Sequence, residues 1–272
     1  MSAKNSQDES AEMSFWDHLD VLRASLFRIV GVLGIVLIGV FVAIPHIFDS
    51  FVLGPTKGDF FIYRLLSFMS NGSGKSSLIM PDLGGEFHVD IININVASQF
   101  LTHISTAFWF SLVIIFPYLI YEIWRFIKPA LFPNEKKGVG GAFLCGTLLF
   151  FIGCAIGYCI VFPLTFRFLT QYQVAQGIVN QISLNSYIST FLTIVFIMGV
   201  VFELPVLAWI LSLLGILNKS FLKNYRKYAV VVLLIVAALI TPSGDPFTLA
   251  VVWLPLYLLY ELSILVVRDK SS

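Results

Sequence analysis

Six long apolar stretches constrain the fold of this chain more than any other feature of its sequence. A straight helix needs roughly 20 apolar residues to cross about 30 Å of hydrocarbon. Hydrophobic residues make up 58% of the 272 residues and charged ones only 12%, whereas soluble domains carry roughly 25% charged residues. So few charges cannot cover the surface of a soluble domain of this size. The sequence therefore predicts an all-α integral membrane protein and excludes a soluble enzyme or a disordered chain.

The apolar stretches predict six transmembrane helices within a single domain that covers residues 1–272. The spans are expected at Ile29–Phe48, Val96–Ile127, Val139–Val161, Tyr187–Leu211, Tyr228–Ile240 and Phe247–Val267. The fifth has only 13 residues, so a thinned bilayer or neighbouring helices must accommodate it. Pro205 removes an amide donor and should kink the fourth. Residues 1–25 form a polar segment that opens an amphipathic helix, and residues 49–95 form a long loop.

Lys and Arg predict the orientation. Thirteen of the 17 basic residues fall on the side that holds both termini, and four on the other. Because cytoplasmic loops carry an excess of Lys and Arg, both termini and the 1–25 segment are expected in the cytoplasm, and the 49–95 loop on the translocated side. The net charge of +1 argues against a nucleic-acid partner.

One acidic residue stands in a constrained segment after the second span. Glu135 follows Pro129 and Pro133, with Trp124 and Phe126 shortly before them. A carboxylate held at a surface can accept two parallel N–H bonds from a guanidinium, which an ammonium group cannot reproduce. The segment is therefore a candidate site for a guanidinium with an apolar segment next to it.

A second acidic residue, Glu203, lies inside the fourth span, next to Pro205. A charged side chain at the centre of a span costs about 2.5–3.5 kcal/mol on insertion scales, so its default interpretation is functional. An acid in a kinked helix suits contact with a partner helix, and it equally suits an ion-coupled carrier. No paired nucleophile and base, metal-ligand spacing or cofactor motif is present in the sequence, so we expect neither an enzyme nor a bound metal or cofactor.

Four motifs together resemble the TatC family, the polytopic core of the twin-arginine protein translocase. The motifs are His18-Leu-x-x-Leu-Arg23, Trp124-x-Phe-Ile-x-Pro-Ala-Leu-Phe-x-x-Glu135, Phe202-Glu-Leu-Pro205 and Thr241-Pro-x-x-Asp245. They occur in the family's order and at the family's places relative to six spans. The resemblance covers nearly the whole chain except the far N-terminus and the Gly/Ser-rich part of the first loop.

The resemblance implies a multi-pass protein of the cytoplasmic (inner) membrane. Such a protein binds the twin-arginine signal peptides of folded cargo proteins at its cytoplasmic face. It also organises single-span partner subunits for export driven by the proton-motive force, and it is homo-oligomeric in the receptor complex. The alternative is an ion-coupled secondary transporter of a small molecule that uses Glu203, although the two comparable halves expected of a carrier are not visible.

The resemblance also implies a role for individual residues in signal-peptide binding. Glu135 reads the arginine pair, with Phe126 and Trp124 beside it, and Arg23 belongs to the N-terminal part of the same site. The family has an acid two residues before this arginine. Here that position is Val21 and the residue before it is Asp20, which leaves open whether Asp20 takes over the acidic role.

The remaining motif residues are implied to serve the membrane interior and the translocated side. Glu203, with Pro205, offers a polar contact to a partner's single span. Pro55 and Asp245 shape the loops on the translocated side.

Overall fold

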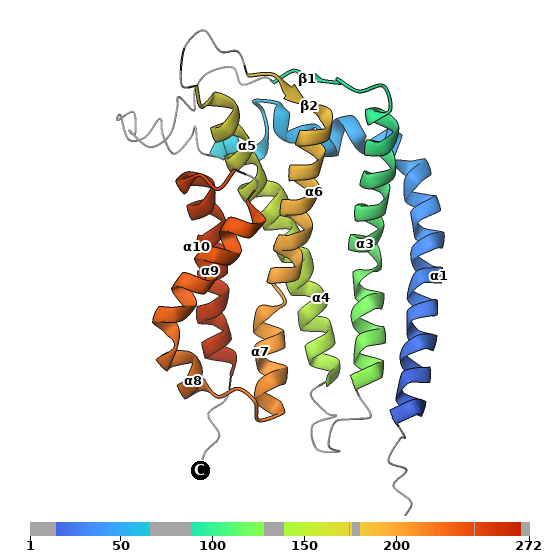
Figure 1. Ribbon diagram of the computed structural model, residues 1–272, viewed down its shortest axis with the longest axis vertical. Helices are drawn as coiled ribbons and strands as arrows, with labels where there is room; N and C mark the ends of the chain where they lie inside the picture. The colour runs from blue at the N-terminus through green and yellow to red at the C-terminus, as the bar shows by residue number, and fades with distance from the viewer. Residues whose placement is uncertain are drawn as a thin grey trace, which may run out of the picture.

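Long helices that run between two ends of a bundle dominate the fold (Figure 1). The computed structural model describes residues 15–65, 89–127, 139–173, 175, 180–241 and 243–267. The start of the first helix and the end of the last lie at the same end of the bundle (Figure 1). We call this end the terminal face and the other end the opposite face. The fold is all-α, as predicted, apart from one very short pair of strands.

Helix α1 (Phe15–Ile47) is one continuous helix of 33 residues. At 1.5 Å per residue it is about 50 Å long, so it is longer than the hydrocarbon of a bilayer. The amphipathic segment and the first span, predicted as neighbours, are therefore one element. A π-helical turn, η1 (Phe48–Val52), and a 3₁₀ turn, η2 (Gly54–Thr56), follow it, so the loop predicted from residue 49 begins with helical turns.

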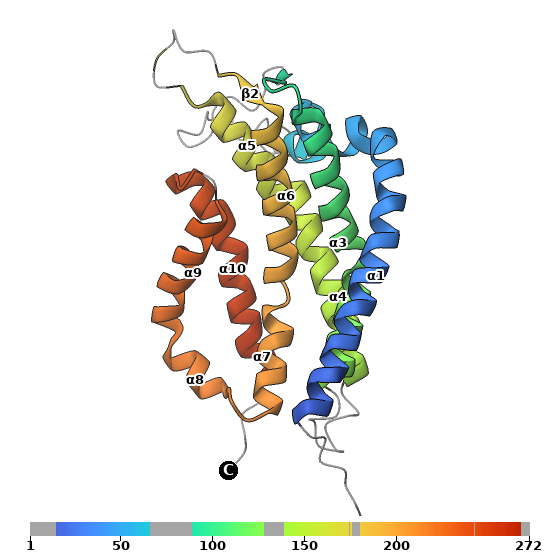
Figure 2. The same ribbon diagram turned by 45° about the vertical axis from the view of Figure 1, so that its right-hand side comes forward.

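Helix α3 (Ser98–Ile127) returns to the terminal face beside α1 (Figures 1 and 2). Near the opposite face, Pro45 lacks the amide hydrogen that would bond the carbonyl of Phe41. His103 of α3 replaces that donor, because its Nε2 lies 2.8 Å from the Phe41 oxygen and the two rings stack with centroids 4.0 Å apart. The histidine is thus a structural partner of a proline-interrupted helix.

The third span is longer than predicted. Its expected end was Val161, but α4 (Val139–Ile156) continues through a π-helical turn, η5 (Gly157–Val161), into α5 (Phe162–Gln171). Pro163 stands in the first turn of α5, where a missing amide costs no helical bond. Arg167 of α5 is buried, and its guanidinium lies 4.9 Å from the centroid of the Tyr63 ring. This contact accommodates the charged side chain, and α5 continues past it to Gln171.

The fourth span is interrupted, which confirms the kink predicted from Pro205. Helix α6 (Leu184–Val201) and helix α7 (Leu204–Leu213) are separated at Phe202 and Glu203. At the opposite face, β1 (Ile91–Ile92) pairs in parallel with β2 (Ile182–Ser183), a small sheet that the apolar pattern did not predict.

The last part of the chain forms α8 (Lys219–Asn224), α9 (Arg226–Ile240) and α10 (Pro246–Val266). With 15 residues, α9 is about 22 Å long, and it packs along α10 with further contact to α6. In the described residues, five helical stretches are long and apolar enough to cross a membrane. Helix α9 is the short element where the fifth span was predicted.

Glycines bring α4 and α6 into close contact in the middle of the bundle. A Cβ atom on Gly153 would lie 2.6 Å from the carbonyl oxygen of Met198, and one on Gly199 would lie 2.6 Å from Sγ of Cys154. Small residues permit such close approach between membrane helices. The contact continues into a core of aromatic and aliphatic side chains that includes Phe162 and Phe191.

Irregular backbone at the opposite face is held by tyrosine hydroxyls. Tyr158 donates to the carbonyl of Phe51 at 2.9 Å, and Tyr187 donates to that of Val52 at 2.6 Å. The last carbonyls of a helical turn lack partners within it and need such donors. These bonds fix the turn that connects α1 to the rest of the opposite face.

Candidate functional site

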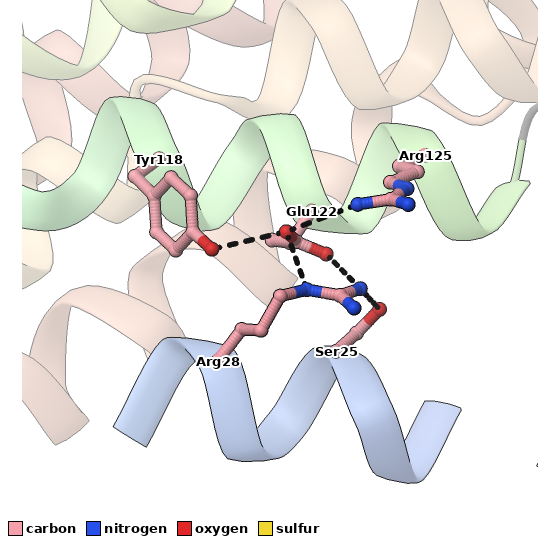
Figure 3. A network of polar contacts seen from close by, with 5 residues as sticks. All are labelled: Ser25, Arg28, Tyr118, Glu122 and Arg125. Carbon is pink, nitrogen blue, oxygen red and sulfur yellow. Dashed lines mark hydrogen bonds and ion pairs between the residues drawn. The ribbon is translucent and has the colours of Figure 1, made fainter. Parts of the chain in front are cut away.

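A network of charged and polar side chains joins α1 to α3 near the terminal face (Figure 3). The guanidinium of Arg28 donates from Nε to Oε1 of Glu122 at 3.1 Å and from Nη2 to Oε2 at 2.9 Å. Nη2 also donates to Oγ of Ser25 at 2.9 Å, and the Tyr118 hydroxyl donates to Oε1 of Glu122 at 3.0 Å. Arg125 stands 3.8 Å from the same oxygen. Both carboxylate oxygens therefore have partners.

The carboxylate of this network is buried, because the Glu122 side chain is only 1% exposed whereas that of Arg28 is 39% exposed. A buried charge is strongly destabilising unless it is paired and hydrogen-bonded. Sequence patterns pointed to Glu203 rather than Glu122, although both are acids within an apolar stretch. Tyr118 and Glu122 are four residues apart on one helical face, a spacing that could have indicated the network.

The first turns of α1 carry the candidate residues Asp20 and Arg23, whose side chains are both exposed. The Arg23 guanidinium lies 5.6 Å from the centroid of the Phe27 ring. Val21, where the family has its acid, is about 40° from Ser25 around the helix, and Asp20 is about 140° from it. Val21 is half-buried and lies toward α3, so Asp20 does not occupy the same face of α1.

The second predicted segment begins at the end of α3. Phe126 is half-buried there, and the end of α3 lies at the same end of the bundle as the start of α1 (Figure 1). Glu135 lies outside the described residues, which stop at Ile127 and resume at residue 139. Trp124 is buried and packs with Val206 of α7, so it holds α3 against α7 rather than lining an exposed surface.

Glu203 lies at the break between α6 and α7 and is half-buried. Its carboxyl group rests against α4 at Gly146, since a Cβ atom there would lie 2.8 Å from Oε2. Its Oε1 is buried and has no hydrogen-bond partner within the described part of the chain. Pro205, the second residue of α7, is buried. The arrangement leaves a polar oxygen unsatisfied inside a membrane-spanning helix, which is costly.

The two candidate loop residues both lie at the opposite face. Pro55 is buried, and its carbonyl accepts a bond from the Tyr63 hydroxyl at 3.1 Å. Asp245 caps the N-terminus of α10, because its Oδ1 accepts from the Thr248 amide at 2.9 Å. Burial by itself would raise the pKa of Asp245, but hydrogen bonds from Ser243 and Thr248 outweigh it and lower that pKa.

The described residues contain no group of three His, Cys, Asp or Glu side chains that could hold a metal ion. The polar side chains described near the terminal face form hydrogen bonds and an ion pair, with the carboxylate of Glu122 as the acceptor. Arginine, with its planar fork of donors, is the side chain that such carboxylates recognise best.

Known proteins resemble this chain over most of its length. The sequence model of the family described as Sec-independent protein translocase protein (TatC) matches residues 17–255. A protein of that name from Blattabacterium sp. subsp. Periplaneta americana is 34% identical over 258 residues, which cover 95% of this chain and 96% of the relative. Another from Deinococcus radiodurans is 39% identical over 182 residues, which cover 66% of each chain.

A solved structure agrees with these sequences. A crystal structure of a twin arginine translocase receptor, TatC, superposes with a TM-score of 0.70 at 28% identity, and the match covers 92% of this chain and 97% of that chain. The comparisons give no support to the alternative of an ion-coupled carrier. Sequence and fold agree, and the chain belongs to the TatC family of Sec-independent protein translocase proteins.

Proposed function

We propose that this chain is the receptor that binds twin-arginine signal peptides of folded proteins, with its terminal face in the cytoplasm. The observation that carries the proposal is that the start of α1, where Asp20 and Arg23 are exposed, and the end of α3, where Phe126 is half-buried, lie at the same end of the bundle (Figure 1). The protein resides in the cytoplasmic membrane as a homo-oligomer and organises single-span partner subunits for export driven by the proton-motive force. It performs no chemical step of its own.

Glu135 is the residue proposed to distinguish arginine from lysine. The two side chains carry equal charge, so a simple negative patch would bind Arg-Arg and Lys-Lys peptides about equally. A carboxylate in a segment constrained by two prolines can instead accept a bidentate guanidinium. Phe126, at the end of α3, provides the apolar contact for the residues that follow the arginine pair.

The test is to measure signal-peptide affinity in nanodiscs for wild type, Glu135→Ala and Glu135→Asp, each with Arg-Arg and Lys-Lys peptides. Charge-assisted bonds contribute about 1.5–3 kcal/mol, so Glu135→Ala should lower Arg-Arg affinity at least about tenfold and lower Lys-Lys affinity less. Glu135→Asp should show a partial loss, because the carboxylate is one methylene shorter. An Arg-Arg preference that survives in Glu135→Ala would assign arginine recognition to another residue.

Glu203 is proposed to bond a polar group on the single span of a partner subunit. The support is its buried Oε1, for which the described residues offer no partner. Glu203→Gln keeps a donor and an acceptor at this position and should retain co-purification of the partners, whereas Glu203→Leu should lose it. Equal recovery of partners with both variants and wild type would refute this contact.

The orientation is open to a direct test. Cysteines at Ser73 and Gly244, in a background that lacks the native ones, should react with an impermeant reagent added outside intact cells. A cysteine at Asn134 should react only after the membrane is opened. External labelling at Asn134 would invert the orientation and with it the receptor proposal.

A further inference from the structure

We infer that the Arg28–Glu122 pair is a positioning device for the signal-peptide site: it fixes the rotation of α1 and so determines which side chains of its first turns stand beside the end of α3. The inference rests on the proposed function, since it concerns the N-terminal half of that site. It assigns a role to two residues that do not themselves touch the peptide.

Helix α1 depends on few contacts for its placement. It packs mainly along α3, and among its described residues only Ser25, Val40 and Ile44 are buried. Val40 and Ile44 contact Ala107 in the half toward the opposite face. In the half toward the terminal face, the buried residue is Ser25, which is part of the polar network. Apolar contact and the His103–Phe41 hydrogen bond therefore hold the half of α1 toward the opposite face, and the polar network holds the other half.

In the half toward the terminal face, apolar contact alone would define the rotation of α1 poorly, because lipid tails solvate an apolar helix as well as another helix does. Directional bonds define it well. The Arg28 fork meets both carboxylate oxygens of Glu122 at 3.1 and 2.9 Å, and Tyr118 fixes the carboxylate from its own helix. A turn of α1 about its axis would break both bonds of the fork and leave Glu122 buried and unpaired, which is the most costly outcome for such a pair.

The consequence lies one to two turns before the pair. With Ser25 and Arg28 facing α3, helical geometry places Val21 toward α3 and Asp20 about 100° away from Val21, in agreement with their burial. Arg23 is exposed on another side. Without the pair, the directional contact of His103 with Phe41, far along the helix, would be left to orient α1, and its first turns could present a different face to Phe126. The pair thus sets the side chains that a bound peptide meets on α1.

The first experiment measures the position of α1. Spin labels at Ala24 on α1 and Gly141 on α4, both exposed, report an interhelical distance in a background whose native cysteines are replaced. Wild type should give a narrow distribution and Glu122→Gln a broad one. The matched control is Glu261→Gln, because Glu261 also pairs with an arginine between two helices, at 2.8 Å from Arg226. It should leave the distribution narrow.

The second experiment measures binding of Arg-Arg and Lys-Lys signal peptides to the same variants in nanodiscs. Glu122→Gln should lower affinity for both peptides roughly tenfold, within the range of coupling energies between sites, and keep their ratio. Glu261→Gln should change neither affinity. The reversed pair, Arg28→Glu with Glu122→Arg, should restore the narrow distribution and most of the affinity, which a purely local packing defect would not allow.

Tyr118→Phe removes one hydrogen bond and leaves the ion pair intact, so it tests the inference even if Glu122→Gln does not fold. We expect a two- to threefold loss of affinity, on the order of half a kcal/mol, and a slightly broader distribution.

Three results would overturn the inference. An unchanged distance distribution in Glu122→Gln would show that the pair does not hold α1. Unchanged affinity despite a broad distribution would show that the rotation of α1 does not matter for binding. A collapse of the Arg-Arg to Lys-Lys ratio would make Glu122 a direct ligand of the arginine. Wild-type protein without any Arg-Arg preference would instead refute the proposed function, and the spin labels would then decide the placement of α1 by themselves.

Discussion

Replacing Gly153 by alanine should force α4 and α6 apart. The new methyl group would stand 2.6 Å from the carbonyl oxygen of Met198 and 2.8 Å from Cβ of Phe202. Ordinary contact begins near 3.4 Å, so the two helices must separate by about 0.8 Å there. The first obstacle is backbone, which cannot rotate away. Gly199, whose Cβ position lies 2.6 Å from Cys154 Sγ, is equally tight, so a local tilt gives no relief.

The magnitude follows from these distances. Overpacking of a close-packed interior lowers the free energy of unfolding by about 1–3 kcal/mol. The better helix propensity of alanine offsets up to about 1 kcal/mol of this. Because the overlap is with backbone, the upper end of this cost applies, and a net loss of about 2 kcal/mol lowers the unfolding temperature by roughly 4–8 °C for a chain of this size class. The same separation should disturb the break between α6 and α7 at Glu203, because the new methyl group displaces Phe202 as well as Met198.

The assay is thermal unfolding in detergent. A thiol dye that reacts with the buried Cys154 as it becomes exposed reports unfolding, in a variant whose Cys145 and Cys159 are replaced. The matched control is Gly39→Ala on α1, where nothing lies within 4 Å of the Cβ position. We expect the control to unfold at the wild-type temperature or slightly above it. Gly153→Ala that unfolds no earlier than this control would refute the reasoning.

Two further predictions concern single hydrogen bonds. His103→Leu should destabilise the protein by about 1 kcal/mol but should cost much less in a Pro45→Ala background, where the restored amide satisfies the carbonyl of Phe41. Equal losses in both backgrounds, measured by thermal unfolding, would contradict this. Asp245→Ala should remove the cap of α10 at a cost of about 1 kcal/mol. Because the pKa of Asp245 is lowered in the fold, its stabilisation is complete above the ordinary pKa of about 3.9 and is lost as the pH falls through the lower folded value. The gap in unfolding temperature between wild type and Asp245→Ala should therefore be constant from pH 7 to 5 and narrow below pH 4, and a gap unchanged at pH 3 would argue against a charged cap.

Much of the fold could be predicted because its physical causes are local in sequence. Apolar length predicts the spans, and the missing amide of Pro205 predicts the break between α6 and α7. The extension of the third span to Gln171 could not be predicted, because it depends on Tyr63 packing over Arg167 from a distant part of the chain. The β1–β2 pair depends in the same way on two segments that meet only in the folded protein.

The residues of the candidate site were likewise predictable only where the signal lies within one short stretch of sequence. Glu203 was recognisable because an acid beside a proline in a span is conspicuous by itself. Glu122 was missed: its spacing from Tyr118 was a weak signal, and its main partner, Arg28, lies 94 residues away. The question of Asp20 and Val21 likewise required knowing which face of α1 meets α3.

The separation of Arg28 and Glu122 along the chain also imposes an order on biosynthesis. Chains are synthesised at about 5–20 residues per second, so the 94 residues between the two represent about 5–19 seconds. During that interval α1 is in the membrane without its electrostatic partner, and Arg28 must extend its guanidinium to the headgroup region. Helix α1 therefore acquires its final rotation only when the far end of α3 leaves the ribosome, well after its own insertion.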